Sequence, residues 1–202
     1  MQKKYLMLVL SLFVLSGLGL IAFSCSTGVE SSPDPGILRV TLQSDPADTF
    51  IVIINDTLTV SNSDSFGVTV FQGKVYHDRD FALLFKSTRS YRTEDLVYNI
   101  IKRENDTYRK SIIYESYVPP GDYDRLEIGF TASLLKIGNF EIPVNLPKNS
   151  NLLLKLPYPF KVFEGSVTEI NLQISPFKSV HRYRDSYLFT RVVQITGVHY
   201  YK

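Results

Sequence analysis

The sequence predicts an all-β protein, built as an antiparallel β-sandwich or barrel. Apolar and polar residues alternate along many short segments, which places one face of each strand on a core and the other in water. Turn-forming residues separate these segments at intervals of roughly 8–12 residues. The chain has 202 residues, of which 44% are hydrophobic, enough for one domain of ordinary size.

The first 24 residues have the composition of an export signal, which we expect to form a helix. Lys3 and Lys4 supply positive charge, and an apolar run extends from Tyr5 to Phe23. An uncleaved transmembrane anchor is the alternative, because roughly 18–20 apolar residues also span a bilayer. Either way, we expect the bulk of the chain outside the cytoplasm.

The single cysteine, Cys25, stands where the apolar run gives way to a polar stretch. The segment Ala22–Cys25 resembles the lipobox of bacterial lipoproteins, although Leu is commonest where Ala22 stands. In that family the cysteine sulfur receives a diacylglycerol, the signal is cut before it, and the new amine is acylated, typically with palmitate. The resemblance implies a lipid anchor at Cys25, in the outer membrane or the outer leaflet of the cytoplasmic membrane, with the domain facing the periplasm or the exterior.

The predicted mature chain has a tether over residues 25–36 and a domain over residues 37–202. Ser26–Gly36 is rich in Ser, Pro and Gly and spans roughly 20 Å as a flexible coil. Loss of Lys3 and Lys4 from the 22 basic residues leaves 20, which equals the 20 acidic residues. This balance argues against a nucleic-acid partner. One cysteine also excludes an internal disulfide and a multi-cysteine metal site.

Period-two alternation recurs from Ile37 onward. It is seen in Leu38–Gln43, Leu126–Phe130, Phe140–Leu146, Leu152–Leu156 and Ile170–Ser175. Two continuous apolar runs, Phe50–Ile54 and Phe81–Phe85, predict strands buried on both faces. Pro143 and Pro157 are expected at sheet edges or bulges, because proline cannot donate to a strand ladder.

Local turn chemistry divides the strands. Turns are predicted at Asp45-Pro46, Asn62–Asp64, Gln72-Gly73, Pro119–Gly121, Gly138-Asn139, Pro147–Asn151 and Glu164-Gly165. Thr93–Lys102 is a weak helix candidate. The charged stretch Lys86–Lys110 around it predicts an insertion or mobile excursion.

Several segments, taken in order, resemble a family of bacterial extracellular and lipoprotein domains known as domain-of-unknown-function family 4382. They are Leu38–Asp48, Pro120–Tyr123 with Leu126–Phe130, Leu152–Gly165, Ile170–Val180 and Tyr187–Val193. Two positions differ. The family often has an Asp shortly before its Lys-Ser pair, where this chain has Ser175-Pro176-Phe177, and a Pro in its last strand, where this chain has Thr190-Arg191. The resemblance implies a sandwich of the transthyretin or immunoglobulin kind. It implies no activity.

Three local groups carry candidate chemistry. Gly121-Asp122-Tyr123 predicts a tyrosine corner, in which the phenol hydrogen-bonds upstream backbone. His77–Asp80 gathers a His and two carboxylates, but four polar residues between apolar strands are more typical of a solvated hairpin turn than of a metal site. Ser179, His181 and Asp185 contain the residue types of a hydrolase, yet no nucleophile elbow is present and a structural Ser179 is favoured.

We therefore expect no catalytic residues, no metal and no cofactor. The preferred function is a non-enzymatic binding or structural role in the cell envelope, with the bilayer as one partner and a glycan or an envelope protein as another. A carbohydrate-binding module is the alternative, with Tyr117, Tyr183 and Tyr187 as the candidate binding residues, because exposed Tyr rings stack on sugars. A hydrolase is the least favoured function.

Overall fold

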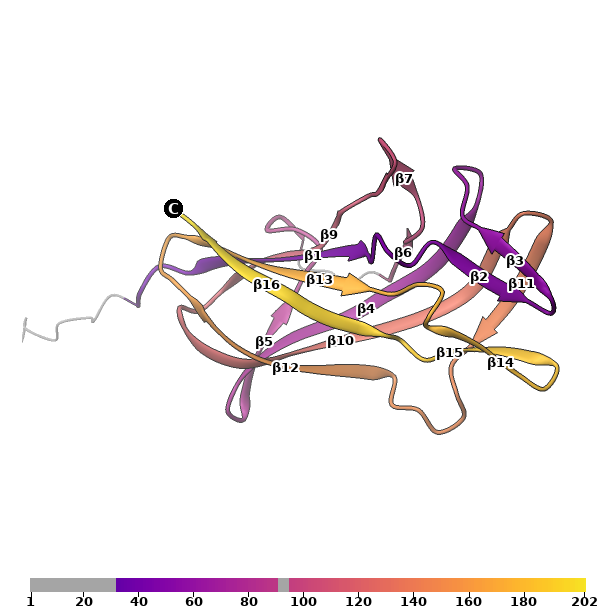
Figure 1. Ribbon diagram of the computed structural model, residues 1–202. Helices are drawn as coiled ribbons and strands as arrows, with labels where there is room; N and C mark the ends of the chain where they lie inside the picture. Colours follow the sequence, from indigo (N-terminus) through magenta and orange to yellow (C-terminus); the bar gives the residue numbers. More distant parts are fainter. Residues whose placement is uncertain (1–31, 91–94) are drawn as a thin grey trace, which may run out of the picture. The chain divides into compact units, whose positions relative to one another are not determined.

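The computed structural model describes residues 32–90 and 95–202. The predicted signal, Cys25 and most of the tether lie outside these residues. Pro33–Lys202 forms one compact unit, which is described below. Its described residues form strands and no helix, which confirms the all-β prediction for this part (Figure 1).

Residues 32–90 and 95–202 include no helix with the length and hydropathy to cross a bilayer. The strands in chain order are β1 (Gly36–Ser44), β2 (Phe50–Ile53), β3 (Asp56–Thr59), β4 (Ser65–His77), β5 (Asp80–Leu84), β6 (Leu96–Asn99), β7 (Arg103–Glu104), β8 (Thr107–Tyr108), β9 (Ser111–Val118), β10 (Gly121–Ile137), β11 (Phe140–Asn145), β12 (Leu153–Val162), β13 (Val167–Ile174), β14 (Val180–Tyr183), β15 (Ser186–Phe189) and β16 (Val193–Tyr201).

A four-stranded sheet has the order β16-β13-β1-β9. β1 pairs antiparallel with β9 but parallel with β13, from Ile37 opposite Val167 to Ser44 opposite Ile174. The sequence predicted antiparallel sheets, and this parallel pair is a departure. Period-two alternation fixes which side chains face the core, but it does not fix the direction of the neighbouring strand.

An eight-stranded sheet is built on two long strands, β4 and β10, which pair from Arg125 opposite Tyr76 to Lys136 opposite Ser65. The other edge of β10 is shared by β12 and β11, and the other edge of β4 is shared by β5 and β6. β11 in turn pairs parallel with β15, which forms a hairpin with β14. Two short ribbons, β2-β3 and β7-β8, complete the unit.

The core lies between the inward faces of the two large sheets, so the unit is sandwich-like. Leu38 and Val40 of β1 and Leu126 and Ile128 of β10 are fully buried, as the alternation predicted. The sheets also meet at one edge, where the Glu115 amide donates to the carbonyl of Phe85 over 3.0 Å. Burial of apolar area, at about 25 cal/mol per Å², is the main stabilising contribution.

Irregular positions in the long strands have local causes. Gln72, predicted in a turn, has a φ of 44° and lies in a β-bulge inside β4, because Gly73 pairs with Ile128 whereas Phe71 pairs with Gly129. Gly129 accommodates the Phe71 ring, whose nearest atom would lie 2.4 Å from an added Cβ.

Pro157 lies in β12, which pairs only with β10 among the described residues, beside a register shift. This placement confirms the edge prediction for Pro157. Pro143 of β11 pairs with Leu134, directly after the bulge at Ser133 of β10.

The prediction that both apolar runs are buried on both faces is wrong. In the first run, Ile51 and Ile53 are buried whereas Phe50, Val52 and Ile54 are exposed. In the second run, Leu84 is buried whereas Phe81 and Leu83 are exposed. Each run is therefore an ordinary alternating strand whose outward positions are occupied by apolar residues.

The region predicted as an insertion is packed where the structure describes it. Leu96–Asn99 forms β6 instead of the helix predicted over Thr93–Lys102, of which Thr93 and Glu94 lie outside the described residues. Ile101 and Tyr108 are buried, and the Tyr108 hydroxyl donates to the Asp48 carbonyl over 2.8 Å. Burial, and then the charge of Asp48, raises the pKa of Tyr108 to about 12.

A row of charges crosses the outer face of the four-stranded sheet. The Arg39 guanidinium lies 2.7 Å from Glu115 and 3.5 Å from Glu169, and Lys110 Nζ lies 2.7 Å from Glu169. Burial alone raises the pKa of Glu169, but hydrogen bonds and charge from Lys110 and Arg39 lower it below its ordinary value. The contacts show that Arg39, Glu115 and Glu169 share one face.

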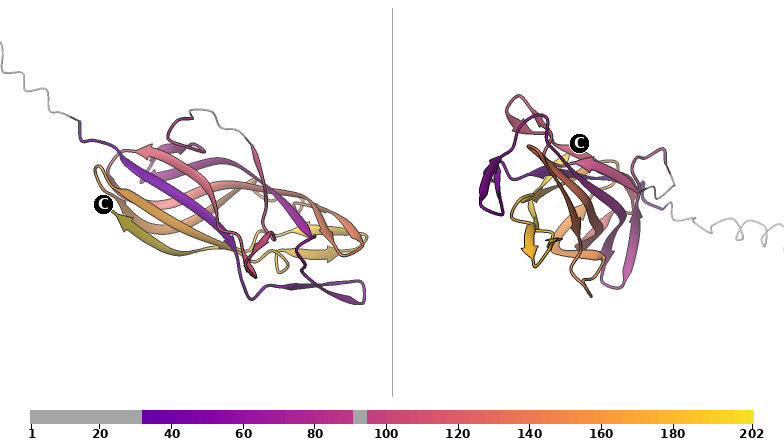
Figure 2. Two further views of the ribbon diagram at one scale, coloured as in Figure 1. Left: turned by 90° about the horizontal axis from the view of Figure 1, so that it is seen from above. Right: turned by 90° about the vertical axis from the view of Figure 1, so that its right-hand side faces the viewer.

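The unit Pro33–Lys202 has two distinct ends. The Gly36 end contains the start of β1, the β9-β10 turn and the β4-β5 turn, because Gly36 pairs with Val118 and Gly121 pairs with Val162. The hairpin end contains the turns of the β2-β3, β10-β11 and β14-β15 hairpins (Figures 1 and 2). Eight residues of β1 and β13 separate the two ends, about 25 Å at strand rise.

Candidate functional site

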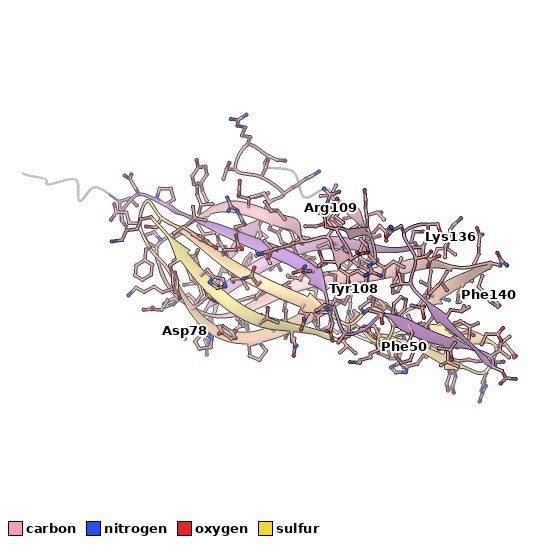
Figure 3. The ribbon with its side chains drawn as sticks, turned by 45° about the horizontal axis from the view of Figure 1, so that its top comes forward. Phe50, Asp78, Tyr108, Arg109, Lys136 and Phe140 are labelled. Carbon is pink, nitrogen blue, oxygen red and sulfur yellow. The ribbon has the colours of Figure 1, made fainter. Side chains whose placement is uncertain are left out.

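The hairpin end is the first candidate surface, because three β-hairpins converge there on a rigid sandwich. Figure 3 shows Phe50 of β2 and Phe140 of β11 toward this end and Asp78 of the β4-β5 turn toward the opposite one. Binding residues are commonly found on such turns, which the sheets hold in place.

A buried carboxylate, Asp48, anchors the segment that leads into β14. Its side chain accepts hydrogen bonds from the amides of Phe177, at 2.8 Å, and Lys178, at 3.1 Å. Satisfying two backbone donors within a buried turn fixes the direction in which the β14-β15 hairpin leaves the core.

Asp64 has the same role for a second hairpin. One of its carboxylate oxygens accepts from the Ser61 amide over 2.7 Å, and the other accepts from the Gly138 amide over 3.0 Å. The predicted turn at Asn62–Asp64 is thereby tied to the predicted turn at Gly138-Asn139, 74 residues further along the chain.

The outward face of the β2-β3 ribbon is apolar and uncharged. Phe50 and Val52 are 54% and 56% exposed, and their cross-strand partners on β3 are Thr59 and Thr57. The inward face, with Ile51 and Ile53, packs on the core. We call Phe50, Val52, Ile54, Thr57 and Thr59 the β2-β3 face. Sequence reasoning missed this face, because the composition of the run indicated complete burial.

The turn at the tip of the same ribbon is strained. Ile54 and Asn55 connect the pair Ile53 and Asp56, and Ile54 has a φ of 59° while its side chain is 64% exposed. A β-branched residue in the left-handed region is a genuine outlier and costs on the order of 1 kcal/mol. No burial of the side chain offsets this cost.

A cavity of about 710 Å³ borders the β14-β15 hairpin. Its walls come from the end of β11 and the loop after it, with Asn145 and Lys148, and from the hairpin, with Tyr183, Asp185 and Ser186. Its size falls within the range of small-molecule sites, roughly 300–1,000 Å³. The lining combines one aromatic ring and two leucine side chains, Leu146 and Leu188, with charged and amide groups.

The three tyrosines predicted as binding residues are not brought together. Tyr183 pairs with Ser186 and lines the cavity, whereas Tyr187 pairs with Arg182 and packs on the core side of the hairpin. Paired residues on neighbouring strands share a face, so Tyr187 lies on the face of Arg182. Arg182 and Tyr183 are successive residues and point to opposite faces, so the two Tyr rings do not form one platform. Tyr117 is 55% exposed but lies opposite Ile37, at the Gly36 end.

Ser179 and His181 do not form a catalytic pair in this arrangement. The Ser179 hydroxyl is buried, donates to the Ser175 carbonyl over 2.6 Å and accepts from the Val192 amide over 2.9 Å. His181 is exposed on β14. The prediction that the Ser179 hydroxyl satisfies backbone groups is confirmed.

The cluster at His77–Asp80 forms the two-residue turn between β4 and β5, with Asp78 at a φ of 53°. His77 Nδ1 lies 2.5 Å from the Asp122 carbonyl. In the described ranges, no three His, Cys, Asp or Glu side chains gather into a group that would hold a metal ion. A cavity of about 240 Å³ lies beside this turn, walled by Phe81, Pro119 and Tyr123 among others.

The tyrosine corner predicted at Gly121–Tyr123 is confirmed. The Tyr123 hydroxyl donates to the Pro119 carbonyl over 2.8 Å, and burial raises the pKa of this phenol. The ring stacks on Phe160 with a centroid distance of 5.4 Å. Tyr123 therefore fixes the β9-β10 turn and has a structural role.

Comparisons of the chain with protein-family models, curated proteins and solved structures gave no significant match. The resemblance to domain-of-unknown-function family 4382 and to the lipoprotein signal therefore stays a prediction.

Proposed function

We propose that this protein is a lipid-anchored bacterial envelope module that holds its domain outside the cytoplasm and engages an envelope protein through its hairpin end. The observation that carries the second half of this proposal is the β2-β3 face, an uncharged apolar surface on a ribbon of only two strands. Such a face, without the charges that normally protect exposed strands, is typical of an interaction surface. The role is binding or structural, not enzymatic.

The anchor is tested by replacing its cysteine. The Cys25→Ala chain should leave the membrane fraction and appear as a soluble extracytoplasmic protein, because no acyl chains hold it. Retention of the variant in membranes would favour an uncleaved apolar span over residues 5–23.

The binding surface is tested by photo-crosslinking in the native envelope. A benzophenone amino acid at position 50 should give a covalent adduct with one envelope protein, and the same amino acid at position 81 should not. Phe50 and Phe81 are matched, with exposed fractions of 54% and 53%. Equal adducts at both positions, or none at either, would contradict the proposal.

The cavity at Tyr183 favours a second candidate function, the binding of a carbohydrate. Its single exposed ring offers a stacking surface, and the side chains of Asn145, Asp185 and Ser186 offer hydrogen bonds to hydroxyls. On a glycan array, Tyr183→Ala should abolish any signal, whereas Tyr117→Ala, at an equally exposed ring, should not.

We also propose that the sandwich belongs to the transthyretin or immunoglobulin kind. Two facing sheets and a tyrosine corner support this assignment. The parallel pairing of β1 and β13 is the feature that differs from the two antiparallel sheets of that architecture.

A further inference from the structure

Four exposed aromatic side chains gather at the Gly36 end, and we call them the aromatic rim. They are Tyr117 of β9, Phe163 after β12, and Tyr200 and Tyr201 of β16, with exposed fractions of 55%, 43%, 51% and 47%. These rings come from three separate strand ends, so their proximity is a product of the fold and not of the sequence.

The register of the four-stranded sheet places two of these rings on one face. Tyr117 pairs with Ile37, Ile37 with Val167, and Val167 with Tyr201. The outward-facing row of Glu115, Arg39 and Glu169 continues to His199, which pairs with Glu169. The four residues Tyr117, Ile37, Val167 and Tyr201 each lie two positions from a residue of that row, so they also point outward. Three strand spacings, about 14 Å, separate Tyr117 from Tyr201.

The remaining two rings lie beside the first residue of β1. The Phe163 and Tyr200 rings meet edge to face with centroids 5.4 Å apart. Gly36 lies directly against the Phe163 backbone, because an added Cβ there would be only 2.4 Å from the Phe163 carbonyl oxygen. The aromatic rim therefore surrounds the position at which the polypeptide joins the domain.

The chain before Gly36 is held at this same place. The Asp34 amide donates to Glu164 Oε1 over 2.9 Å, next to Phe163. The tether that leads back toward Cys25 spans only roughly 20 Å as a coil. A lipid on Cys25 would therefore keep the aromatic rim close to the bilayer surface.

We propose that the aromatic rim rests in the headgroup region of the membrane that carries the anchor. This inference rests on the proposed lipidation of Cys25. Tyr rings have an apolar body and a polar hydroxyl, which suits the boundary between headgroups and acyl chains. Lys161, whose Nζ lies 5.7 Å from the centre of the Phe163 ring and 3.8 Å from Asp122 Oδ1, lies at the same end, where its charge is paired. The hairpin end, with its β2-β3 face, then points away from the bilayer.

The test measures the nitration of individual tyrosines by mass spectrometry. The lipidated wild-type protein is placed in vesicles of phosphatidylcholine and phosphatidylglycerol, and the Cys25→Ala chain in buffer without lipid is the reference. Nitration of Tyr117, Tyr200 and Tyr201 should fall at least about fivefold on the vesicles, because rings held in the interface leave water. Tyr183, which is as exposed as Tyr117 but lies at the hairpin end, should react equally in both samples. Equal nitration of the rim tyrosines in both samples overturns the proposal.

Two double variants distinguish insertion of the rim side chains into the membrane from simple shielding of the rim by a nearby membrane. Tyr117→Ser with Phe163→Ser should restore the nitration of Tyr200 and Tyr201 on vesicles, because the rim then loses half of its apolar surface. The control, Phe50→Ser with Tyr183→Ser, removes rings that are at least as exposed from the hairpin end and should leave the protection intact. Protection that survives the rim variant contradicts a role for these side chains.

Failure of the anchor has its own signature. If the wild-type protein does not float with the vesicles whereas a lipid-anchored control protein does, the lipidation proposal fails. The rim proposal is then judged by adding excess vesicles to the Cys25→Ala chain, where unchanged nitration of Tyr117 and Tyr201 refutes it. Protection of the rim in native membranes but not on pure lipid would show that a protein covers it, which also refutes lipid as the partner.

Discussion

Two apolar runs of similar composition, Phe50–Ile54 and Phe81–Phe85, have different surroundings in the fold. Both alternate between a buried and an exposed face. Lys74 Nζ lies 4.8 Å from the centre of the exposed Phe81 ring, and the Tyr76 ring lies 5.7 Å away. Phe50, in contrast, has only Thr59 across from it on a two-stranded ribbon.

The difference shows that the composition of a strand does not determine which side chains its outward residues contact. β5 belongs to an eight-stranded sheet, in which Lys74 and Tyr76 of β4 contact the Phe81 ring while leaving it 53% exposed. β2 has one neighbour, β3, whose outward residues are too short to cover Phe50 and Val52. The run whose exposed ring has no such contact with a charged or aromatic side chain among the described residues is the one that we expect to contact a partner.

The largest losses of stability should come from substitutions on the inward faces of the two runs. These losses should be equal for the two runs. Ile53→Ala and Leu84→Ala should each lower the free energy of unfolding by about 2–5 kcal/mol, because each leaves a cavity in the core. Urea unfolding of both variants measures this. A loss below about 1 kcal/mol for Ile53→Ala alone would mean that the β2-β3 ribbon unfolds independently of the core.

Substitutions of the outward aromatic residues should change the free energy of unfolding differently in the two runs. Phe81→Ala should cost about 1 kcal/mol, because it removes the contacts of the ring with Lys74 and Tyr76. Phe50→Ala should change stability by less than about 0.5 kcal/mol. Thermal and urea unfolding of the two variants side by side decide this point, and equal losses would remove the contrast between the runs.

The turn of the β2-β3 ribbon should gain stability when its strain is relieved. Ile54→Gly should raise the free energy of unfolding by about 0.5–1 kcal/mol, because glycine adopts a φ of 59° without steric cost. Asn55→Gly, at the neighbouring position without a positive φ, is the control and should not stabilise. A destabilised Ile54→Gly protein would show that the Ile54 side chain has a folding role.

The smallest effect on stability should come from Val52→Thr, within about 0.5 kcal/mol, because the side chain is 56% exposed. The same substitution should weaken crosslinking from position 50 to an envelope protein. A variant that is equally stable but binds less well separates function from folding, whereas unchanged crosslinking would argue against the β2-β3 face.

Local features of this protein were predictable, and non-local ones were not. The tyrosine corner at Tyr123, the strand alternation and most turns depend on residues within a few positions of one another, and the sequence contains that information. The exposure of Phe50 and the parallel direction of β13 depend on which strands become neighbours, which no short pattern encodes. The separation of Tyr183 from Tyr187 depends on the register of one hairpin, which also lay beyond the pattern.

The pairing of β1 with β13 has a consequence for how the chain acquires its structure. Ile37 and Val167 are 130 positions apart, and β1 occupies an interior place in its sheet. A polypeptide that emerges amino-terminus first, from a ribosome or through a translocation channel, keeps that side of β1 unmatched until almost the whole sequence has followed. Such long-range closure slows acquisition of the native state.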